Sequence, residues 1–366
     1  MDIRSRISSY TEDPILNKMW SQVRSCPPLR SMSVDITHRC NLRCTGCYFF
    51  SEGMESFKEK ELDELTTFIE QQKAKGITFA TVLGGEPALV PEKLALLAEN
   101  FNLMIVTNGS RPIPKAGLEN VAIAVSMWGD KENDIILRGN GRQDIFSKGL
   151  VNFKNDERAI WYITLPSNPA PATEQVVDEC VANGNLVAFN YYGDLEDVGG
   201  NNDHTKGFEA ARNFVNRMIE KYPNAIAFNG YLNDVITSGK LMDEKWGYDV
   251  CGSISVDNPI NAQRLQNGNS YNPYFNAYLP DLKSTRRCCV GESRDCSTCY
   301  DVWSHVSWVA MNMEKHLYSK QSFFDWLATM YMFYGTSRLI DGNEFKALLP
   351  LIHSWKNTPS EERLSA

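Results

Sequence analysis

The residues best suited to chemistry in this sequence are cysteines. The chain has 366 residues and ten cysteines, three of which form the pattern Cys40-x3-Cys44-x2-Cys47. Three thiolates in one loop suit a 4Fe-4S cube, whose protein ligands are thiolates, and leave one iron without a protein ligand. An open metal position is what a catalytic site needs. Zinc is the alternative metal, but zinc sites commonly use paired CxxC knuckles or histidine, and no histidine follows this loop at such spacing.

A second cysteine group lies in the last third of the chain. Its members are Cys251, Cys288, Cys289, Cys296 and Cys299. Five thiols are enough for one site with four thiolate ligands, which could hold zinc or a second 4Fe-4S cluster. Because neighbouring side chains point in different directions, we expect Cys288 and Cys289 to supply one ligand between them. Free thiols are the remaining alternative.

Composition is ordinary for a soluble globular protein. Hydrophobic residues make up 43% of the chain and charged residues 22%. The net charge of −8 does not favour a nucleic-acid partner, which needs a basic surface. The first residues are charged and no run of about 18 apolar residues occurs, so we expect no secretory signal, no membrane span and a cytoplasmic location. In a reducing cytoplasm, grouped cysteines favour metal binding over disulfides.

Strand-like and helix-like segments alternate through the first half of the chain. We predict buried strands at 31–37, 77–83, 103–107, 121–127, 159–165 and 186–190, and helices at 91–100, 142–154 and 171–183. Ser56 and Glu59 have the spacing of a capping box and predict the start of a further helix, which ends at Gly76. This alternation predicts a parallel sheet with crossover helices, as in a partial (β/α)6 TIM-like barrel.

Several polar motifs lie where predicted strands end. The cysteine loop follows the first strand, Gly84-Gly85-Glu86-Pro87 follows the second, and Thr107-Asn108 follows the third. Ser126 lies at the end of the fourth strand and Asn190 at the end of the sixth. Functional groups of parallel sheets gather at the carboxyl ends of the strands. We therefore expect these residues to share one site.

The segment CNLRCTGCYFF resembles the signature of the radical S-adenosylmethionine (radical SAM) superfamily, which is CxxxCxxC followed by an aromatic residue, here Tyr48. The GGEP segment at 84–87 resembles the second motif of that superfamily, and the resemblance covers roughly residues 30–195. It implies a 4Fe-4S cluster that binds S-adenosylmethionine at the open iron. One electron from the cluster would cleave S-adenosylmethionine into methionine and a 5′-deoxyadenosyl radical, which abstracts hydrogen from a substrate.

The same resemblance implies which residues bind S-adenosylmethionine. Residues 84–85 would let the backbone approach the methionine amino group, Glu86 would accept a hydrogen bond from that ammonium, and Pro87 would stiffen the turn. The other candidates are Tyr48, Thr107, Asn108, Ser126, Arg138 and Asn190. Arg138 would pair with the carboxylate and Asn190 would lie near adenine. The ordinary alternatives are a simple turn at GGEP, a solvated arginine and a strand-end asparagine.

We divide the chain into an N-terminal segment at 1–30, a barrel at 31–235 and a mostly helical, cysteine-containing extension at 236–366. The extension resembles SPASM or twitch extensions in position but lacks the seven-cysteine SPASM pattern, so we expect one auxiliary cluster. Arg286 and Arg287 are expected on the surface; the alternative is that they meet an anionic substrate. The end of the extension is rich in aromatic residues: Trp303, Trp308, Phe323, Phe324, Trp326, Tyr331, Phe333 and Tyr334. They are expected to pack in the core; the alternative is that they cover a substrate cavity.

These features predict a radical SAM enzyme that oxidises or functionalises a C–H position of a small-molecule or peptide substrate in a biosynthetic pathway. A flavodoxin- or ferredoxin-type protein would supply electrons. The alternative is a non-catalytic iron–sulfur electron carrier or redox sensor. The GGEP motif argues against a carrier, because a carrier needs no pocket for S-adenosylmethionine.

Overall fold

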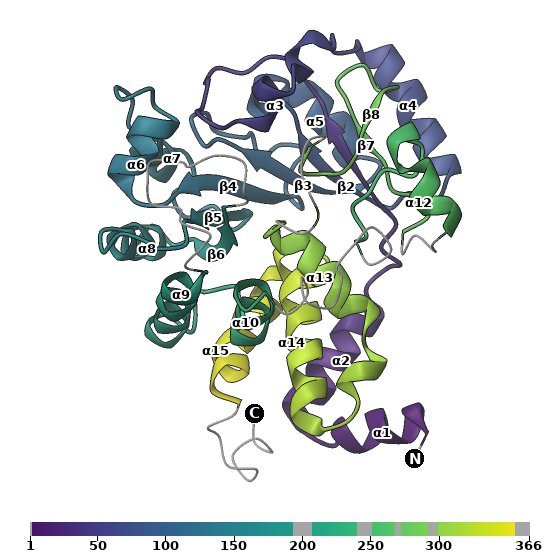
Figure 1. Ribbon diagram of the computed structural model, residues 1–366, viewed down its shortest axis with the longest axis vertical. Coiled ribbons are helices and arrows are strands. Elements are labelled where there is room, and N and C mark those ends of the chain that lie inside the picture. The colour runs from purple at the N-terminus through teal and green to yellow at the C-terminus, as the bar shows by residue number, and fades with distance from the viewer. Residues whose placement is uncertain are drawn as a thin grey trace.

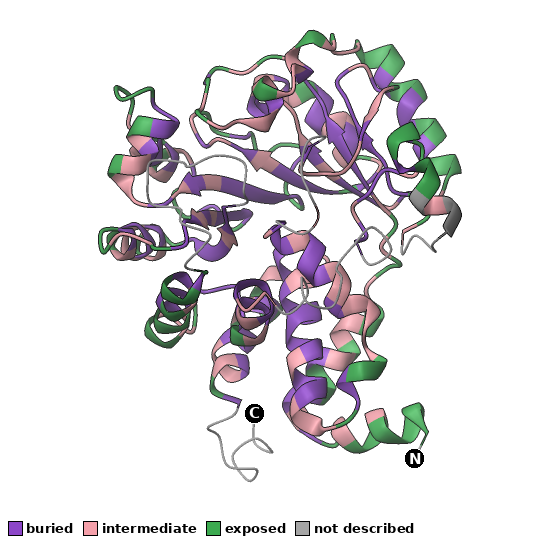
Figure 2. Cartoon of the chain, in the orientation of Figure 1, coloured by how far each residue is buried: buried purple, intermediate pink, exposed green. Residues whose placement is uncertain are grey.

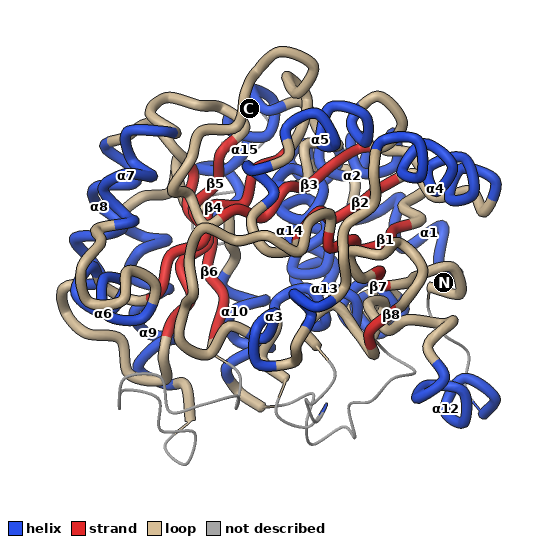
Figure 3. The backbone as a smooth tube through the Cα atoms, turned by 90° about the horizontal axis from the view of Figure 1, so that it is seen from above, coloured by secondary structure: helices blue, strands red, loops and turns tan. Residues whose placement is uncertain are grey.

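The computed structural model describes residues 2–192, 207–239, 251–267, 272–291, 296 and 299–355. Its centre is an eight-stranded sheet with the strand order β6-β5-β4-β3-β2-β1-β7-β8. The parallel strands are β1 (Ser31–Asp35), β2 (Phe79–Leu83), β3 (Asn102–Thr107), β4 (Ala122–Trp128), β5 (Ala159–Leu165) and β6 (Leu186–Tyr191). Seen from above, the strands follow an arc with α4, α5, α7 and α8 outside it (Figure 3).

Helices precede, interrupt and follow this sheet (Figure 1). Before and within the six-strand part they are α1 (Ile3–Tyr10), α2 (Pro14–Ser25), α3 (Tyr48–Ser51), η1 (Met54–Ser56), α4 (Leu62–Ala74), η2 (Pro87–Leu89), α5 (Pro91–Ala98), α6 (Lys131–Leu137), α7 (Ile145–Asn152) and α8 (Thr173–Ala182). After it come α9 (Glu209–Lys221), α10 (Gly230–Thr237), η5 (Pro259–Asn261), α12 (Ala262–Asn267), α13 (Val302–Met311), η7 (Glu314–His316), α14 (Lys320–Thr336) and α15 (Gly342–Ser354).

The expected partial barrel is confirmed, and the extension adds two strands to it. β7 (Ala277–Tyr278) pairs in parallel with β1, and β8 (Thr285–Arg286) pairs antiparallel with β7. Two-residue strands leave no periodic pattern in a sequence, so sequence analysis missed both. The extension is thus continuous with the barrel sheet.

The capping box was placed wrongly in the sequence analysis. Ser56 lies in the short helix η1, and α4 begins later, at Leu62. The capping box is made by Glu61 and Glu64 instead. Glu59 does not cap a helix, because its carboxylate accepts hydrogen bonds from Thr37 and Arg39 at the start of the cysteine loop. Gly76 follows the helix with a φ of +79°, as a terminating glycine does.

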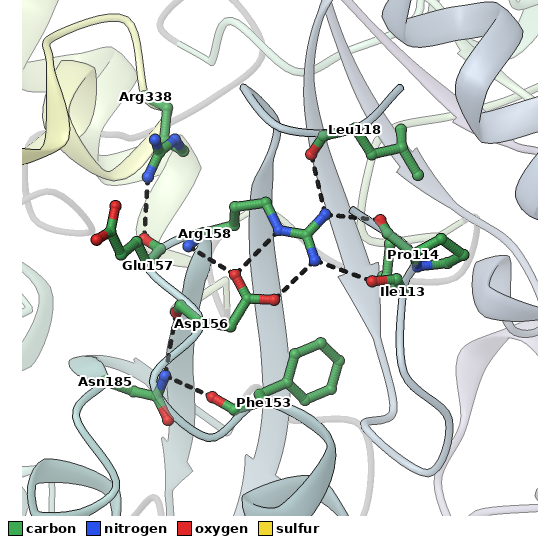
Figure 4. A network of polar contacts seen from close by, with 9 residues as sticks. All are labelled: Ile113, Pro114, Leu118, Phe153, Asp156, Glu157, Arg158, Asn185 and Arg338. Carbon is green, nitrogen blue, oxygen red and sulfur yellow. Dashed lines mark hydrogen bonds and ion pairs between the residues drawn. The ribbon is translucent and has the colours of Figure 1, made fainter. Parts of the chain in front are cut away.

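A buried arginine holds the amino end of β5 to the loop before β4 (Figure 4). Arg158 forms an ion pair with Asp156 at 2.7 Å and donates hydrogen bonds to the carbonyl oxygens of Ile113, Pro114 and Leu118. The guanidinium is therefore paired and hydrogen-bonded, as a buried charge must be. This network lies at the opposite end of the sheet from the cysteine loop.

Helices α13 and α14 lie inside the arc of strands and close the open side of the barrel (Figure 3). The strands and α14 are largely buried, whereas α4 and α9 show exposed outer faces (Figure 2). Buried side chains of α14, such as Phe323, Leu327 and Tyr331, belong to the main core together with strand residues. Among the described residues, we find no helix with the length and apolar character needed to cross a bilayer.

Buried histidines make the stability of this fold depend on pH. Burial lowers the pKa of His305 to about 4 and also lowers the pKa of His316 and His353. Below the ordinary value of 6.5 the unfolded chain takes up protons that the folded chain does not, so stability is lost as the pH falls from 6.5 toward 4.

We predict that His305→Gln removes part of this pH dependence. The shift at His305 corresponds to at most about 3 kcal/mol. Urea unfolding at pH 7 and pH 5 should show a smaller loss of free energy of unfolding in the variant than in the unmodified chain. Equal losses in both proteins would contradict the prediction.

Candidate active site

The cysteine loop lies across the carboxyl ends of β1 and β2. Gly85 donates its backbone N–H to the carbonyl oxygen of Thr37 at 2.9 Å, and Glu86 donates to that of Arg39 at 2.9 Å. On the other side, the N–H of Thr45 donates to the carbonyl oxygen of Leu137 at 2.8 Å, at the end of α6. The loop is therefore held by backbone hydrogen bonds from both directions.

The three thiols of this loop are electrostatic neighbours. Burial raises the pKa of Cys40 to about 11 and that of Cys44 to about 12, and it also raises the pKa of Cys47. Cys47 contributes to the rise at both other thiols, while the guanidinium of Arg138 opposes the rise at Cys44. The thiols are protonated at neutral pH, so a metal must displace their protons when it binds.

The fit of a cluster to this loop depends on the donor chemistry. The loop offers three free thiols, each of intermediate exposure, which can ligate three irons and leave the fourth open. The donor set thus fits the expected cluster.

The two glycines of the GGEP segment permit close contact with the cysteine loop. Gly84 has a φ of +129°, which a side chain disfavours. A Cβ atom on Gly85 would lie 2.0 Å from the carbonyl oxygen of Arg39. Glycine is therefore required here because the backbone of the cysteine loop occupies the space that a side chain would need.

Glu86 connects the GGEP segment to the next strand end. Its buried carboxylate accepts hydrogen bonds from Oγ1 of Thr107 at 2.6 Å, the backbone N–H of Asn108 at 2.8 Å and that of Ala88 at 2.9 Å. Burial raises its pKa, and these three donors oppose the rise. Asn108 in turn donates from its side chain to Oδ1 of Asn41 at 3.0 Å. The expected roles of Glu86, Pro87, Thr107 and Asn108 toward S-adenosylmethionine stay predictions.

Arg138 is buried, at 2% exposure, and ties α6 to two strand ends. Its guanidinium lies 2.6 Å from Asp134 and donates to the carbonyl oxygens of Ser126 at 2.5 Å and Asn108 at 3.1 Å. The solvated alternative is therefore wrong. Pairing of Arg138 with a bound carboxylate stays a prediction.

A buried ion pair joins the extension to the first strand. Nη1 of Arg286 lies 2.6 Å from Oδ2 of Asp35, and both side chains are completely buried. The same guanidinium donates to the hydroxyls of Tyr48 and Ser33, both at 3.3 Å, and lies 5.1 Å from the ring centre of Tyr48. The expectation that Arg286 lies on the surface is wrong. A charged residue at the end of a buried strand, Asp35, was the sequence signal for such a partner.

Burial and the mutual attraction of the two charges have opposite effects on the pKa values of Asp35 and Arg286. Burial raises the pKa of the Asp35 carboxyl, and the Arg286 guanidinium opposes that rise. Burial works against the charge on Arg286, but Asp35 and Tyr48 together raise its pKa above the ordinary value. Arg286 therefore stays charged directly beneath the end of the cysteine loop.

The five cysteines of the extension come together in space. Cys251, Cys288 and Cys296 contact one small cluster of apolar side chains that includes Val235 and Ile254. Burial raises the pKa of Cys251 well above its usual value, and nearby Cys299 and Cys288 add to the rise. An antiparallel backbone bridge between Ile254 and Cys288 brings the segment that contains Cys251 next to the segment that contains Cys288.

Cys288 and Cys289 do face different surroundings. The Cys288 thiol donates to the carbonyl oxygen of Gly291 at 3.3 Å and packs with Cys251 and Cys296. Cys289 instead lines the central cavity, as Cys47 does. The two cysteine groups therefore approach the same cavity from different elements.

The central cavity has a volume of about 740 Å³, within the range of small-molecule sites. Of the residues expected to bind S-adenosylmethionine, it is lined by Tyr48, Ser126 and Asn190. The GGEP segment, Thr107, Asn108 and Arg138 are not among the described residues that line it. They are connected to one another by the hydrogen bonds from Thr107 to Glu86 and from Arg138 to Asn108.

The aromatic residues of the extension divide between core and cavity. Phe323, Phe324 and Tyr331 are buried in the main core, as expected. The cavity is lined by Trp303, Trp326, Phe333 and Tyr334. Core packing alone is thus an incomplete description of these helices. Helical spacing could not separate the two groups, because α14 is buried on nearly every side.

Residues 34–148 match the sequence profile described as the Radical SAM superfamily. The chain contains a radical SAM domain. Superfamily members bind a 4Fe-4S cluster and S-adenosylmethionine. The matched residues include the whole cysteine loop, the GGEP segment and α6 with Arg138.

Curated relatives of this radical SAM domain are enzymes of several kinds. The chain is 29% identical over 127 residues to GTP 3′,8-cyclase of Lactiplantibacillus plantarum, covering 31% of this chain and 38% of that protein. It is 29% identical over 134 residues to Fe-coproporphyrin III synthase of Methanosarcina barkeri, covering 33% of each. It is 25% identical over 170 residues to the sporulation killing factor maturation protein SkfB of Bacillus subtilis, covering 43% of this chain and 41% of that protein. The chain therefore matches well under half the length of these relatives.

Two solved structures have a low overall similarity to this chain. One is anSMEcpe with bound S-adenosylmethionine and a peptide, with a TM-score of 0.48, 16% identity and coverage of 77% of this chain and 84% of that one. Another is Streptococcus suis SuiB bound to the precursor peptide SuiA, with a TM-score of 0.37, 17% identity and coverage of 57% and 49%.

We predict that Arg286→Met destabilises the protein by about 3–5 kcal/mol, because it leaves the Asp35 carboxylate buried without a partner. The double variant Asp35→Leu/Arg286→Met should regain most of that loss, since apolar replacement of both partners is often neutral. Anaerobic urea denaturation measures both. A double variant as unstable as the sum of the two single variants would show that the residues do not act as a pair.

Proposed function

We propose that this protein is a radical SAM enzyme that abstracts hydrogen from a small-molecule or peptide substrate. The observation that carries the proposal is the position of Cys47 and Tyr48 in the lining of the central cavity, which Ser126 and Asn190 also line. A carrier of electrons or a redox sensor needs no such cavity next to its cluster. The cavity therefore favours the enzyme over that alternative.

We assign the first cluster to Cys40, Cys44 and Cys47. When bound, a 4Fe-4S cluster with S-adenosylmethionine at its open iron supplies reductive cleavage to a 5′-deoxyadenosyl radical. The residues of the chain position these groups: the GGEP backbone supports the loop, Ser126 and Asn190 face the cavity, and Arg286 anchors Tyr48. The apolar walls limit water around the reactive position.

We assign a second 4Fe-4S cluster to the extension. Its thiols influence one another's pKa, that of Cys289 included, which supports a common site. We assign Cys251, Cys288, Cys296 and Cys299 as the four ligands. Cys289 is the remaining thiol and faces the cavity. Such a cluster would accept the second electron of a two-electron substrate oxidation, and a flavodoxin- or ferredoxin-type protein would reduce the first cluster. The barrel at 31–235 and the extension at 236–366 would then each hold one cluster.

The lining of the cavity argues against a nucleoside triphosphate, although GTP 3′,8-cyclases are among the relatives. Of the described residues that line it, Arg30 is the one cationic side chain. Triphosphate recognition needs several cationic or backbone donors. An oxidation or C–H functionalisation of a less charged substrate is therefore the better assignment.

We predict that replacing Cys40, Cys44 and Cys47 together with alanine reduces 5′-deoxyadenosine formation to background. The measurement is product formation by anaerobically reconstituted protein after addition of dithionite. The control is the double variant Cys26→Ala/Cys180→Ala, which removes cysteines outside both groups and should retain cleavage. Undiminished cleavage by the triple variant would refute the proposed function.

We predict that replacing Cys296 and Cys299 with alanine lowers the iron and sulfide content by about one 4Fe-4S cluster. Some cleavage of S-adenosylmethionine should remain, because the first cluster is intact. The same Cys26→Ala/Cys180→Ala variant serves as the control. An unchanged iron content would mean that the extension holds zinc or free thiols.

A further inference from the structure

We infer that the substrate places a neutral aromatic ring system in the inner half of the cavity, against helices α13 and α14. That this ligand is the substrate rests on the proposed function, whereas its aromatic character is inferred from the cavity lining alone. The inner half is the part farther from the cysteine loop, between β3, β4 and β5 and the two helices.

The cavity lining changes character along the strands. Near the carboxyl ends, in the part that we call the polar half, Ser126, Thr164 and Asn190 add polar groups to a lining that also includes the rings of Trp128 and Tyr192. Farther along, Met104 and Ala124 of β3 and β4 lie with Phe79 in an apolar cluster that Tyr162 and Trp303 also contact. The polar half suits the ribose and amino-acid groups of S-adenosylmethionine. The apolar half is left for a different molecule.

One wall of the apolar half is a row of aromatic rings. The ring centres of Tyr162 and Trp303 lie 6.4 Å apart, those of Trp303 and Phe333 lie 5.2 Å apart, and those of Phe333 and Tyr334 lie 5.5 Å apart. All four residues line the cavity. Since the rings restrain one another, a planar ligand can stack or pack edge-on without ordering them first.

The charges of the lining favour a neutral ring. Arg30 and Asp301 are the charged side chains among the described lining residues. Asp301 caps α13 by accepting from the backbone N–H groups of Trp303 and Ser304, and Arg30 stacks on Tyr274 at 4.8 Å. Neither charge lies on β3, β4 or β5. A charged group in the apolar half would therefore lose hydration without gaining a partner.

Small side chains create the space that the ring would fill. Side chains normally fill the interior of a barrel of this size. Here Ala124 of β4 lines the cavity and belongs to the apolar cluster that Tyr162 and Trp303 contact. Ala124→Leu would add side-chain volume beside these two rings and should exclude a ring of the ligand.

The test uses the full-length, anaerobically reconstituted protein with S-adenosylmethionine and without reductant. Calorimetric titration compares 2-naphthol with decahydro-2-naphthol, its saturated counterpart. We expect 2-naphthol to bind once per chain and about two- to tenfold more tightly than the saturated probe. Trp303→Leu should remove most of this preference, and Ala124→Leu should abolish binding of both probes.

The control is Trp355→Leu, which removes an indole that is stacked on Phe324 outside the cavity and should leave the preference intact. Circular dichroism checks that each variant is folded, and Trp303→Leu tests the inference should Ala124→Leu fail to fold. Equal affinity for the two probes, or unchanged binding by both cavity variants, would overturn the inference. Cleavage of S-adenosylmethionine is assayed separately on the same samples. If the protein cleaves S-adenosylmethionine but shows no preference for 2-naphthol, only the inference of an aromatic ligand is rejected. If it prefers 2-naphthol but does not cleave S-adenosylmethionine, the aromatic ligand is supported and the proposed radical SAM function is rejected.

Discussion

The arrangement of the site depends on the buried pair between Arg286 and Asp35. Two completely buried charges 2.6 Å apart are stable only when each satisfies the other, so β8 and β1 cannot separate without exposing an uncompensated charge to the protein interior. Because Arg286 also contacts Tyr48, the same pair positions the end of the cysteine loop. Cys288 and Cys289 follow Arg286 directly, so this interaction places the second cysteine group as well.

The residues around this pair fall into two groups, those that hold the loops in place and those that face the cavity. The GGEP segment and Arg138 form hydrogen bonds with the backbone of the cysteine loop and of the strand ends, and Arg138 also pairs with Asp134. The residues that face the cavity come from the strand ends and from helices α13 and α14 of the extension. A buried carboxylate such as Glu86 can hold two strand ends together because three donors compensate its burial. These motif residues therefore position the loop, whatever further contact they make with a bound cofactor.

The extension does more than add a second group of thiols. It closes the open side of a six-strand barrel, contributes two short strands to the sheet and lines the inner cavity with aromatic rings. A radical reaction needs an enclosed site, since water and oxidants compete for the reactive group. The same helices supply the aromatic wall against which we propose that the substrate packs, while the strand ends are left for the proposed cofactor.

The sequence by itself determined the parallel strands, the radical SAM resemblance and the thiols of the cysteine loop, because strand periodicity and cysteine spacing are local properties of the chain. The prediction of a capping box at Ser56 and Glu59 is wrong, because the Glu59 carboxylate binds Arg39 in the cysteine loop. Only the tertiary structure decided that Arg286 is buried, that Cys289 rather than Cys288 lines the cavity, and that Trp303 and Phe333 line it as well. Each of these depends on partners far away in the sequence. The residues next to an apolar or charged residue in the sequence do not indicate which distant part of the chain will pack against it. Only the packed structure therefore distinguishes a core residue from one that lines a site.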